Sequence, residues 1–192
     1  MSAWRMARDR APRGEPRQPR PPVLRPRAII DVLEKHEVKY VIIGGIGARL
    51  WGSPRNTDDL DICPAAERAN RRRLAEALTQ LEARLRPPGL EEEGFAPPGG
   101  WDERSFDSMV SVALTTDVGW IDIWFVPDGT QGYDDLIKTA SDVSIGGRNV
   151  KVADIGDIIR SKAAAGRNKD LAALDHLREL QRRRAELGRG TL

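Results

Sequence analysis

Cysteine, histidine and long apolar runs are all scarce in this sequence of 192 residues. Cys63 is the single cysteine, which excludes an internal disulfide and fits a reducing cytosol. His36 and His176 are the two histidines, and with one cysteine they are too few and too widely separated for a zinc site. No run of about 18 apolar residues is present, as a transmembrane helix would need, and the first residues have no apolar signal-peptide core. We therefore expect a cytoplasmic protein with no membrane partner.

Charge is unevenly distributed along the chain. Residues 1–27 hold eight arginines against one Asp and one Glu, together with many prolines and almost no aliphatic side chains. This composition predicts a disordered basic arm, and the remainder of the chain is mildly acidic. The arm is compatible with contacts to nucleic-acid phosphates and equally with an unstructured start that has no function. The length suits one domain, or one domain with a small helical annex.

The most informative stretch begins with an apolar run at residues 40–43, which predicts a buried strand. The strand runs into Gly44 and Gly45, where the missing Cβ atoms let backbone N–H groups approach a ligand closely. Residues 46–51 then predict a short helix, whose N-terminus is suited to an anion. Residues 52–54, Gly-Ser-Pro, end that helix. The pattern predicts a turn that cradles phosphate.

The chain returns with Asp59 and Asp61 alternating with Leu60 and Ile62. On a strand, this alternation places both carboxylates on one face and both aliphatic side chains on the other. Two adjacent carboxylates repel each other unless a cation lies between them. Hard oxygen ligands suit Mg²⁺, with Mn²⁺ as an alternative. The competing interpretation of the whole stretch is a glycine turn followed by a solvated acidic edge strand.

A phosphate-binding turn followed by a metal-binding carboxylate pair is the layout of phosphoryl transfer. The motif, read in order, is Gly44-Gly45 followed by Arg55-x-Thr57-x-Asp59-x-Asp61. It resembles the signature of the DNA polymerase β-like nucleotidyltransferase superfamily and, more narrowly, that of the AbiEii/MenT-type nucleotidyltransferase toxins. The family usually has Gly-Ser or Gly-Gly at this turn; the turn here is Gly-Gly, so backbone N–H groups in place of a serine would contact the phosphates. Arg55 and Thr57 are expected to brace the loop or to touch phosphates.

The superfamily resemblance implies a third carboxylate on a neighbouring strand, and Asp122 matches that position. Residues 119–126 predict a strand in which Asp122 is surrounded by apolar side chains. An Asp in such a strand is costly to bury unless it is paired or liganded. The alternative for Asp122 is an exposed edge position. Asp117 is the weaker candidate, because it lies in a predicted turn, where Asp is common.

A second motif lies in the C-terminal section, where residues 155–187 predict two helices broken near Gly166. Lys162 followed by Arg167-x-Lys169-Asp170 resembles a second signature of the same family. The resemblance implies that Lys162 binds the nucleotide triphosphate and that Arg167 and Asp170 complete or brace the site. A lysine is a compact counter-charge for a triphosphate. Alternatively, Lys162 is an ordinary surface lysine and Asp170 is a helix cap.

The resemblance implies an α/β (α+β) architecture: a small mixed β-sheet of the nucleotidyltransferase fold, flanked by helices. We expect a core at residues 28–153 and a C-terminal helical section at 154–192 that completes the active site. Helices are also predicted at 28–37, at 133–139 and at 65–86, where the last has Leu74, Leu78, Leu81 and Leu85 on one face. A strand is predicted at 109–115, and strands at 143–145 and 149–152 form a hairpin around Gly146 and Gly147. Residues 87–107 predict a loop-rich insert anchored by Trp101 and Phe106. Arg71, Arg72 and Arg73 predict a solvated helix face, with an RNA contact as the alternative.

These patterns predict a metal-dependent nucleotidyltransferase that uses an NTP as substrate. By family resemblance, the acceptor is the 3′ end of tRNA, and the protein is the toxin of a toxin–antitoxin pair with a separate antitoxin protein. One alternative is nucleotidylation of a small molecule, such as an antibiotic, or of a protein. Another is a nucleotide- or RNA-binding module without catalysis. The paired carboxylates argue against that module, because a binding domain has no need for two repelling charges.

Overall fold

The computed structural model describes residues 22–87 and 94–189. Residues 1–21 of the predicted arm and residues 88–93 of the predicted insert lie outside the described part. The elements in chain order are α1 (Pro26–Lys35), β1 (Tyr40–Ile42), α2 (Gly44–Leu50), β2 (Asp59–Pro64), α3 (Arg68–Gln80), β3 (Arg84–Leu85), the 3-10 helix η1 (Glu103–Phe106), β4 (Ser111–Thr116), β5 (Gly119–Trp124), α4 (Tyr133–Leu136), β6 (Ser141–Ile145), β7 (Arg148–Val152), α5 (Ile155–Ala165) and α6 (Asn168–Arg189).

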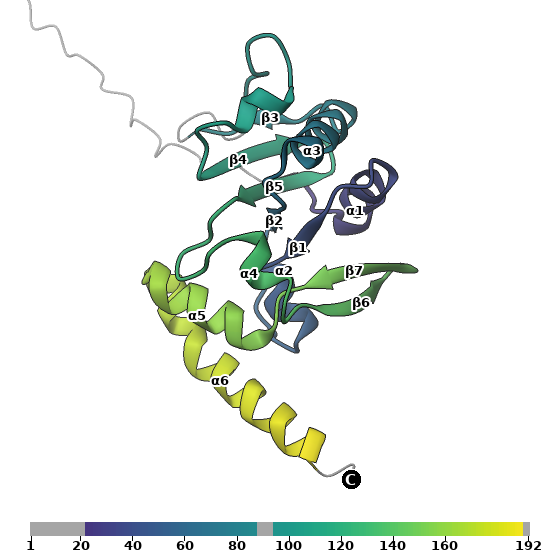
Figure 1. Ribbon diagram of the computed structural model, residues 1–192. Coiled ribbons are helices and arrows are strands. Elements are labelled where there is room, and N and C mark those ends of the chain that lie inside the picture. Colours follow the sequence, from purple (N-terminus) through teal and green to yellow (C-terminus); the bar gives the residue numbers. More distant parts are fainter. Residues whose placement is uncertain (1–21, 88–93, 190–192) are drawn as a thin grey trace, which may run out of the picture.

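Seven strands form one mixed sheet in the order β3-β4-β5-β2-β1-β7-β6. At its centre, β2 pairs antiparallel with β1 and parallel with β5, while β1 pairs parallel with β7. Hairpins β4–β5 and β6–β7 extend the sheet on either side. The predicted α/β class with a small mixed sheet and flanking helices is confirmed (Figure 1).

The central strand β1 is buried on both faces, as its continuous apolar sequence predicts. Tyr40 and Ile42 pack into a core that includes side chains of α1 and α3. Val41 belongs to a second core with α4, α5 and α6. Figure 1 shows α1 and α3 grouped together and α5 and α6 at the other side of the molecule. The sheet therefore separates two apolar layers, and the C-terminal helices cover only part of the second face.

The predicted helix over residues 65–86 is too long at its C-terminal end. Helix α3 ends at Gln80, and Leu85, predicted on its apolar face, lies in β3. Glu82 has a positive φ of 49°, which reverses the chain direction after the helix. The chain then pairs Arg84 with Thr115 of β4. Pairing with a distant strand overrides the local helical pattern here.

Helix α1 starts at Pro26, two residues before residue 28, where the core was predicted to begin. Proline is suited to a first helical turn, since its ring sets φ and its missing N–H needs no partner there. The backbone N–H of Arg25 donates to the Val118 carbonyl oxygen (2.8 Å). Residues 25–27, predicted as part of the arm, are therefore attached to the sheet.

Three predicted features of the chain path are confirmed. Gly166 caps α5 in the left-handed conformation (φ 61°) and separates it from α6. Gly146 and Gly147 form the turn of the β6–β7 hairpin with positive φ angles. Trp101 anchors the insert: its ring stacks on Phe106 (5.8 Å between centroids), and its Nε1–H donates to the Ala83 carbonyl oxygen (2.9 Å).

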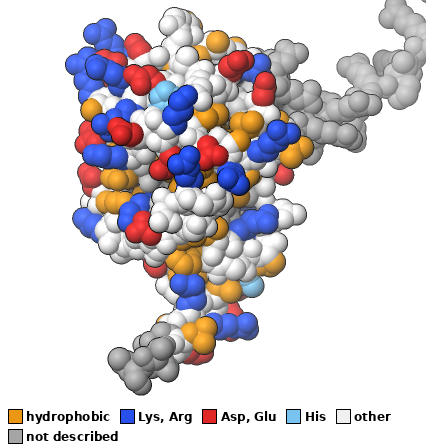
Figure 2. Space-filling model, turned by 90° about the vertical axis from the view of Figure 1, so that its right-hand side faces the viewer, with side chains coloured by type: hydrophobic (Ala, Val, Ile, Leu, Met, Phe, Trp, Pro, Cys, Tyr) orange, Lys and Arg blue, Asp and Glu red, His pale blue; other side chains and the backbone are white. Residues whose placement is uncertain are grey.

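Arg71 and Arg72, two of the three arginines predicted on the polar face of α3, lie beside carboxylates, as does Arg68. Arg71 lies 2.6 Å from Asp107, and Glu103 receives both Arg68 (2.8 Å) and Arg72 (3.6 Å). Figure 2 shows Lys and Arg intermixed with Asp and Glu over one face of the molecule. These contacts favour a solvated, ion-paired helix face over an RNA contact. None of the described helices is both long and apolar enough to cross a lipid bilayer.

A buried amide fixes α3 to the central strands. Asn70 is fully buried; its Oδ1 accepts from the Lys39 N–H (2.7 Å), and its Nδ2 donates to the carbonyl oxygens of Lys39 and Ala65 (2.9 Å each). These bonds connect the start of β1 and the end of β2 to one helix. They position α3 against the antiparallel β1–β2 pair, which carries the glycine turn and the two adjacent carboxylates.

We predict that Asn70→Ala lowers the free energy of unfolding by about 2–3 kcal/mol, because it removes three hydrogen bonds and deprives the Lys39 N–H and the Ala65 carbonyl oxygen of the buried amide. The exposed Asn149 of β7 provides the control. Asn149→Ala should change stability by less than about 0.5 kcal/mol. Urea unfolding of the two variants measures the difference, and equal values would contradict this role for Asn70.

Candidate functional site

Three carboxylates meet on the face of the sheet opposite α1 and α3. Asp59 and Asp61 project from β2, where they alternate with the fully buried Leu60 and Ile62 as predicted. Asp122 lies on the adjacent parallel strand β5, in register with Asp61. Oxygen atoms of the three carboxylates all lie within 4.8 Å of one another. Neighbouring strands thus bring together residues that are 61 positions apart.

Neighbouring donors orient the two carboxylates of β2. Thr57 Oγ1 donates to Asp59 Oδ1 (2.5 Å), and Trp124 Nε1 donates to Asp61 Oδ1 (3.3 Å). The Gly45 backbone N–H donates to Asp61 Oδ2 (3.2 Å). Such donors hold ligand oxygens in place before a metal arrives. Both carboxylates retain free lone pairs that could bind a metal ion.

The charges in this cluster are electrostatically unfavourable without a cation. Burial, followed by repulsion from Asp59 and Asp122, raises the pKa of Asp61 to about 7. Burial also raises the pKa of Asp122, although Arg86 beside it acts in the opposite direction. Three hard oxygen donors of like charge at this spacing fit a divalent cation such as Mg²⁺.

The glycine turn packs directly against Asp61. Helix α2 begins at Gly44, two residues earlier than predicted, because Gly44 has a positive φ (60°) that lets the chain turn at once. A Cβ on Gly44 would lie 2.0 Å from Asp61 Oδ2, and one on Gly45 would lie 2.5 Å from Thr57 Oγ1. Both glycines are therefore required by the approach of the turn to the loop and strand that follow.

A basic cluster faces the carboxylates from the C-terminal helices. Asp170 of α6, only 1% exposed, receives Lys162 Nζ on Oδ1 (2.8 Å) and Arg167 Nε on Oδ2 (2.5 Å). Burial alone would raise the pKa of Asp170, but the bonds from these two cations hold it below its usual value. The sequence left Asp170 open between a site residue and a helix cap. Its carboxylate anchors Lys162 and Arg167.

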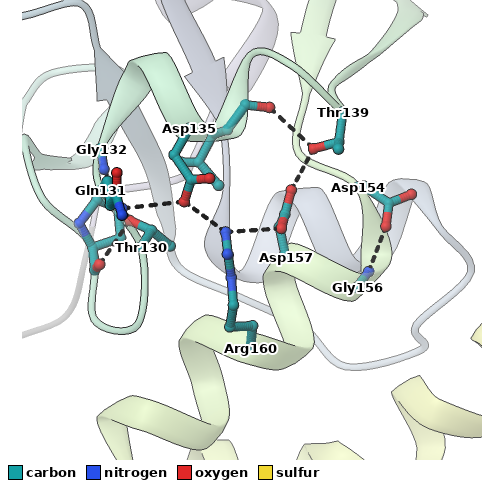
Figure 3. A network of polar contacts seen from close by, with 11 residues as sticks. Thr130, Gln131, Gly132, Asp135, Thr139, Asp154, Gly156, Asp157 and Arg160 are labelled. Carbon is teal, nitrogen blue, oxygen red and sulfur yellow. Dashed lines mark hydrogen bonds and ion pairs between the residues drawn. The ribbon is translucent and has the colours of Figure 1, made fainter.

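A polar network fixes the helix that carries Lys162. Arg160 of α5 lies 2.7 Å from Asp135 of α4 and 2.9 Å from Asp157 of its own helix. Thr139 donates to Asp157 as well (2.5 Å). Figure 3 shows Arg160 between the two carboxylates, with Thr139 reaching Asp157 from the opposite direction. The network holds α5 against α4, and this sets the position of Lys162 relative to the sheet.

The carboxylates and the basic cluster line one cleft of about 470 Å³. All ten residues that the two motifs and Asp122 predicted for the site line it: Gly44, Gly45, Arg55, Thr57, Asp59, Asp61, Asp122, Lys162, Arg167 and Asp170. Asp117, the weaker candidate, is an exposed turn residue 3.7 Å from Arg84. His36 and His176 do not line the cleft.

Among the further residues that line the cleft, sequence reasoning missed Arg86, Trp120, Trp124 and Lys169 as site residues. Trp120 and Trp124 share the strand parity of Asp122, and Lys169 lies inside the second motif, so these patterns were available. Arg86 had no such signal, because it was placed at the end of a predicted helix. Its contact with Asp122 arises from the pairing of β3 with β4.

Comparison with known structures identifies the fold. The lincomycin-bound crystal structure of LnuA, a lincosamide antibiotic adenylyltransferase, superposes with a TM-score of 0.55 at 14% sequence identity, and covers 82% of this chain and 98% of LnuA. The chain has a nucleotidyltransferase fold. Two further structures each have a TM-score of 0.49. TM1012 of Thermotoga maritima, a putative nucleotidyltransferase, has 18% identity and covers 81% of this chain and 94% of its own. The antibiotic-resistance factor ANT(2'')-Ia has 16% identity and covers 85% of this chain and 93% of its own. No protein-family model and no curated protein sequence matches the chain.

The nucleotidyltransferase fold agrees with the coarser of the two resemblances in the sequence, that to the superfamily. Its central strands β2 and β5 supply the carboxylates here, α5 supplies Lys162, and the turn between α5 and α6 supplies Arg167. The comparisons do not confirm the narrower assignment to AbiEii/MenT-type toxins.

The raised pKa of Asp61 predicts a pH-dependent stability of the metal-free protein. The folded state keeps a proton on Asp61 up to about pH 7, whereas the unfolded chain loses it near pH 4. The contribution of Asp61 to stability therefore falls as the pH rises from about 4 to about 7, and the loss persists above that. Asp61→Asn should be more stable than the wild type in EDTA, by a margin that is larger at pH 8 than at pH 5.

Urea unfolding at the two pH values measures this margin. Mg²⁺ should stabilise the wild type at pH 8 and have little effect on Asp61→Asn, because a carboxylate ligand is missing. A margin that does not change with pH would contradict the proposed environment of Asp61.

The contact between Gly44 and Asp61 predicts a site-specific effect of an added methyl group. Gly44→Ala should lower the free energy of unfolding by about 2–5 kcal/mol, through the positive φ and the clash together. Gly147 is the matched control, since it also has a positive φ (88°) but nothing within 4 Å of an added Cβ. Gly147→Ala should cost only about 1 kcal/mol. Thermal melting of the two variants measures these losses, and similar losses of stability in Gly44→Ala and Gly147→Ala would argue against the close packing of Gly44 on Asp61.

Proposed function

We propose that this protein is a divalent-metal-dependent nucleotidyltransferase, which transfers a nucleoside monophosphate from an NTP to an acceptor hydroxyl and releases pyrophosphate. The observation that carries the proposal is the arrangement of three carboxylates opposite Lys162 and Arg167 in one cleft of a nucleotidyltransferase fold. Such a cleft offers ligands for a metal and counter-charge for phosphates, which are the two requirements of phosphoryl transfer.

Each residue has a role in this proposal. Asp59, Asp61 and Asp122 would hold Mg²⁺ or Mn²⁺, which would neutralise phosphate charge and polarise the reacting phosphoryl group. Lys162 and Arg167, held by Asp170, compensate the charge of the triphosphate. Thr57 orients Asp59 through its hydrogen bond. Gly44 and Gly45 allow the phosphates to approach the backbone, and Arg55 lines the same cleft without a carboxylate partner among the described residues.

Two acceptors are supported by different observations. The motif resemblance to AbiEii/MenT-type toxins supports the 3′ end of tRNA, with a toxin acting in the cytoplasm and neutralised by an antitoxin protein. The likeness to LnuA, at 14% identity, is a likeness of fold over 98% of that chain. Because LnuA is a lincosamide antibiotic adenylyltransferase, the shared fold supports a small molecule such as an antibiotic as the acceptor. Loss of catalysis is the least favoured alternative, because the three carboxylates and the basic cluster are all present.

The decisive experiment supplies purified protein with Mg²⁺ and each of the four α-labelled NTPs, in turn, with total tRNA or with a panel of lincosamide and aminoglycoside antibiotics. We predict label on one class of acceptor with a preferred NTP. Asp59→Ala should reduce the labelling rate by about a hundredfold or more. The exposed Asp117 offers a matched control, and Asp117→Ala should keep the wild-type rate.

The outcomes separate the proposals. Label on tRNA would establish the RNA acceptor, and growth arrest on induction that Asp59→Ala abolishes would support the toxin role. Label on an antibiotic would establish the small-molecule acceptor. Labelling that Asp59→Ala leaves intact, or no binding of any NTP, would overturn the proposed activity.

A further inference from the structure

Arg86 contacts the carboxylate cluster from outside both motifs. It follows β3, and its backbone N–H donates to the Ala113 carbonyl oxygen of β4 (2.9 Å). Its side chain then reaches Asp122 on the next strand, where Nη2 donates to Oδ1 (2.6 Å). The two side chains are only 12% and 19% exposed. The direct attraction within a shielded ion pair of this kind is less screened by water than that of a pair at the surface.

Stacking holds the guanidinium of Arg86 in place. Its central carbon lies 4.0 Å from the centroid of the Trp120 ring, on the same strand face as Asp122. Its Nε is buried and has no hydrogen-bond partner in the described part of the chain. The position of the guanidinium therefore depends on the Trp120 ring and on Asp122, and no second carboxylate competes for it in the described part.

Arg86 and a divalent cation make conflicting demands on Asp122. Asp122 is one of the three carboxylates within 4.8 Å that could share a metal ion. Mg²⁺ takes its oxygen ligands at about 2.0–2.1 Å. A metal bound by all three carboxylates would thus share Asp122 with a guanidinium, and the two cations would repel each other. One oxygen of Asp122 is already engaged, and Arg86 cancels part of the negative charge that attracts the metal.

We propose that Arg86 is the counter-ion of the carboxylate cluster in the nucleotide-free protein, and that it competes with the divalent metal for Asp122. Metal binding is then weak until nucleotide phosphates supply further oxygen ligands, as Mg²⁺ prefers in such sites. The inference rests on the proposed function, because it assumes that the cluster binds metal and an NTP. Arg86 acts through Asp122 and is a positioning residue.

The test measures Mn²⁺ affinity without nucleotide, by electron paramagnetic resonance of free Mn²⁺. Arg86→Met keeps an apolar stem for Trp120 but removes the charge, and it should tighten Mn²⁺ binding at least about tenfold. Arg86→Lys keeps a cation near Asp122 and should change the affinity much less. Arg84→Met is the matched control, since Arg84 lies on the same segment but pairs with the exposed Asp117 (3.7 Å). It should leave Mn²⁺ binding unchanged.

A second measurement excludes a merely structural effect. At a saturating concentration of an α,β-methylene NTP, the affinity for Mn²⁺ should change less than about threefold in Arg86→Met, because Arg86 opposes the metal only while the nucleotide is absent. Circular dichroism confirms that each variant is folded, and Arg86→Gln replaces Arg86→Met if the latter is not.

Unchanged or weaker Mn²⁺ binding in the folded variant would overturn the role of Arg86 while leaving the proposed function intact. No Mn²⁺ binding by either the wild type or Arg86→Met would overturn both.

Discussion

The repulsion among three carboxylates is the physical constraint on which the rest of this site depends. Adjacent strands lie about 4.7–4.9 Å apart, so residues in register on one face cannot separate. Asp61 and Asp122 are in register on β2 and β5, and Leu60, Ile62, Ile121 and Ile123 anchor the opposite face of both strands in the core. The apolar core thus holds the carboxylates together against their own charge. Cations are the means by which such an arrangement becomes favourable.

The C-terminal helices show the complementary arrangement, an acid that organises cations. Asp170 is buried and receives both Lys162 and Arg167, so the two positive charges are presented from one point at the edge of the cleft. The Arg160 network locks α5 against α4, and Gly166 turns the chain into α6. Charges of both signs are therefore held in place by burial and hydrogen bonds, which is the form of preorganisation that stabilises a charged transition state.

Local patterns predicted much of this molecule. The alternation of Asp59 and Asp61 with Leu60 and Ile62 predicted the strand and its polar face, because a strand repeats every two residues. Gly166 predicted the break between two helices, since it can adopt a left-handed conformation without strain. The same reasoning failed at residues 81–86. An apolar side chain at helical spacing, Leu85, was assigned to α3, but it pairs with β4 in the sheet.

The sequence by itself determined which side chains carry charge, which face of each strand they occupy and where the chain turns, because these depend on spacing and on single residues. Only the tertiary structure decided that β5 lies beside β2, that Asp170 is buried between Lys162 and Arg167, and that Arg86 reaches Asp122. Lys162 and Asp170 are 8 residues apart across the break between two helices, Arg86 and Asp122 are 36 apart, and Asp61 and Asp122 are 61 apart. No local periodicity encodes such pairs, because they result from the packing of the whole sheet and its helices.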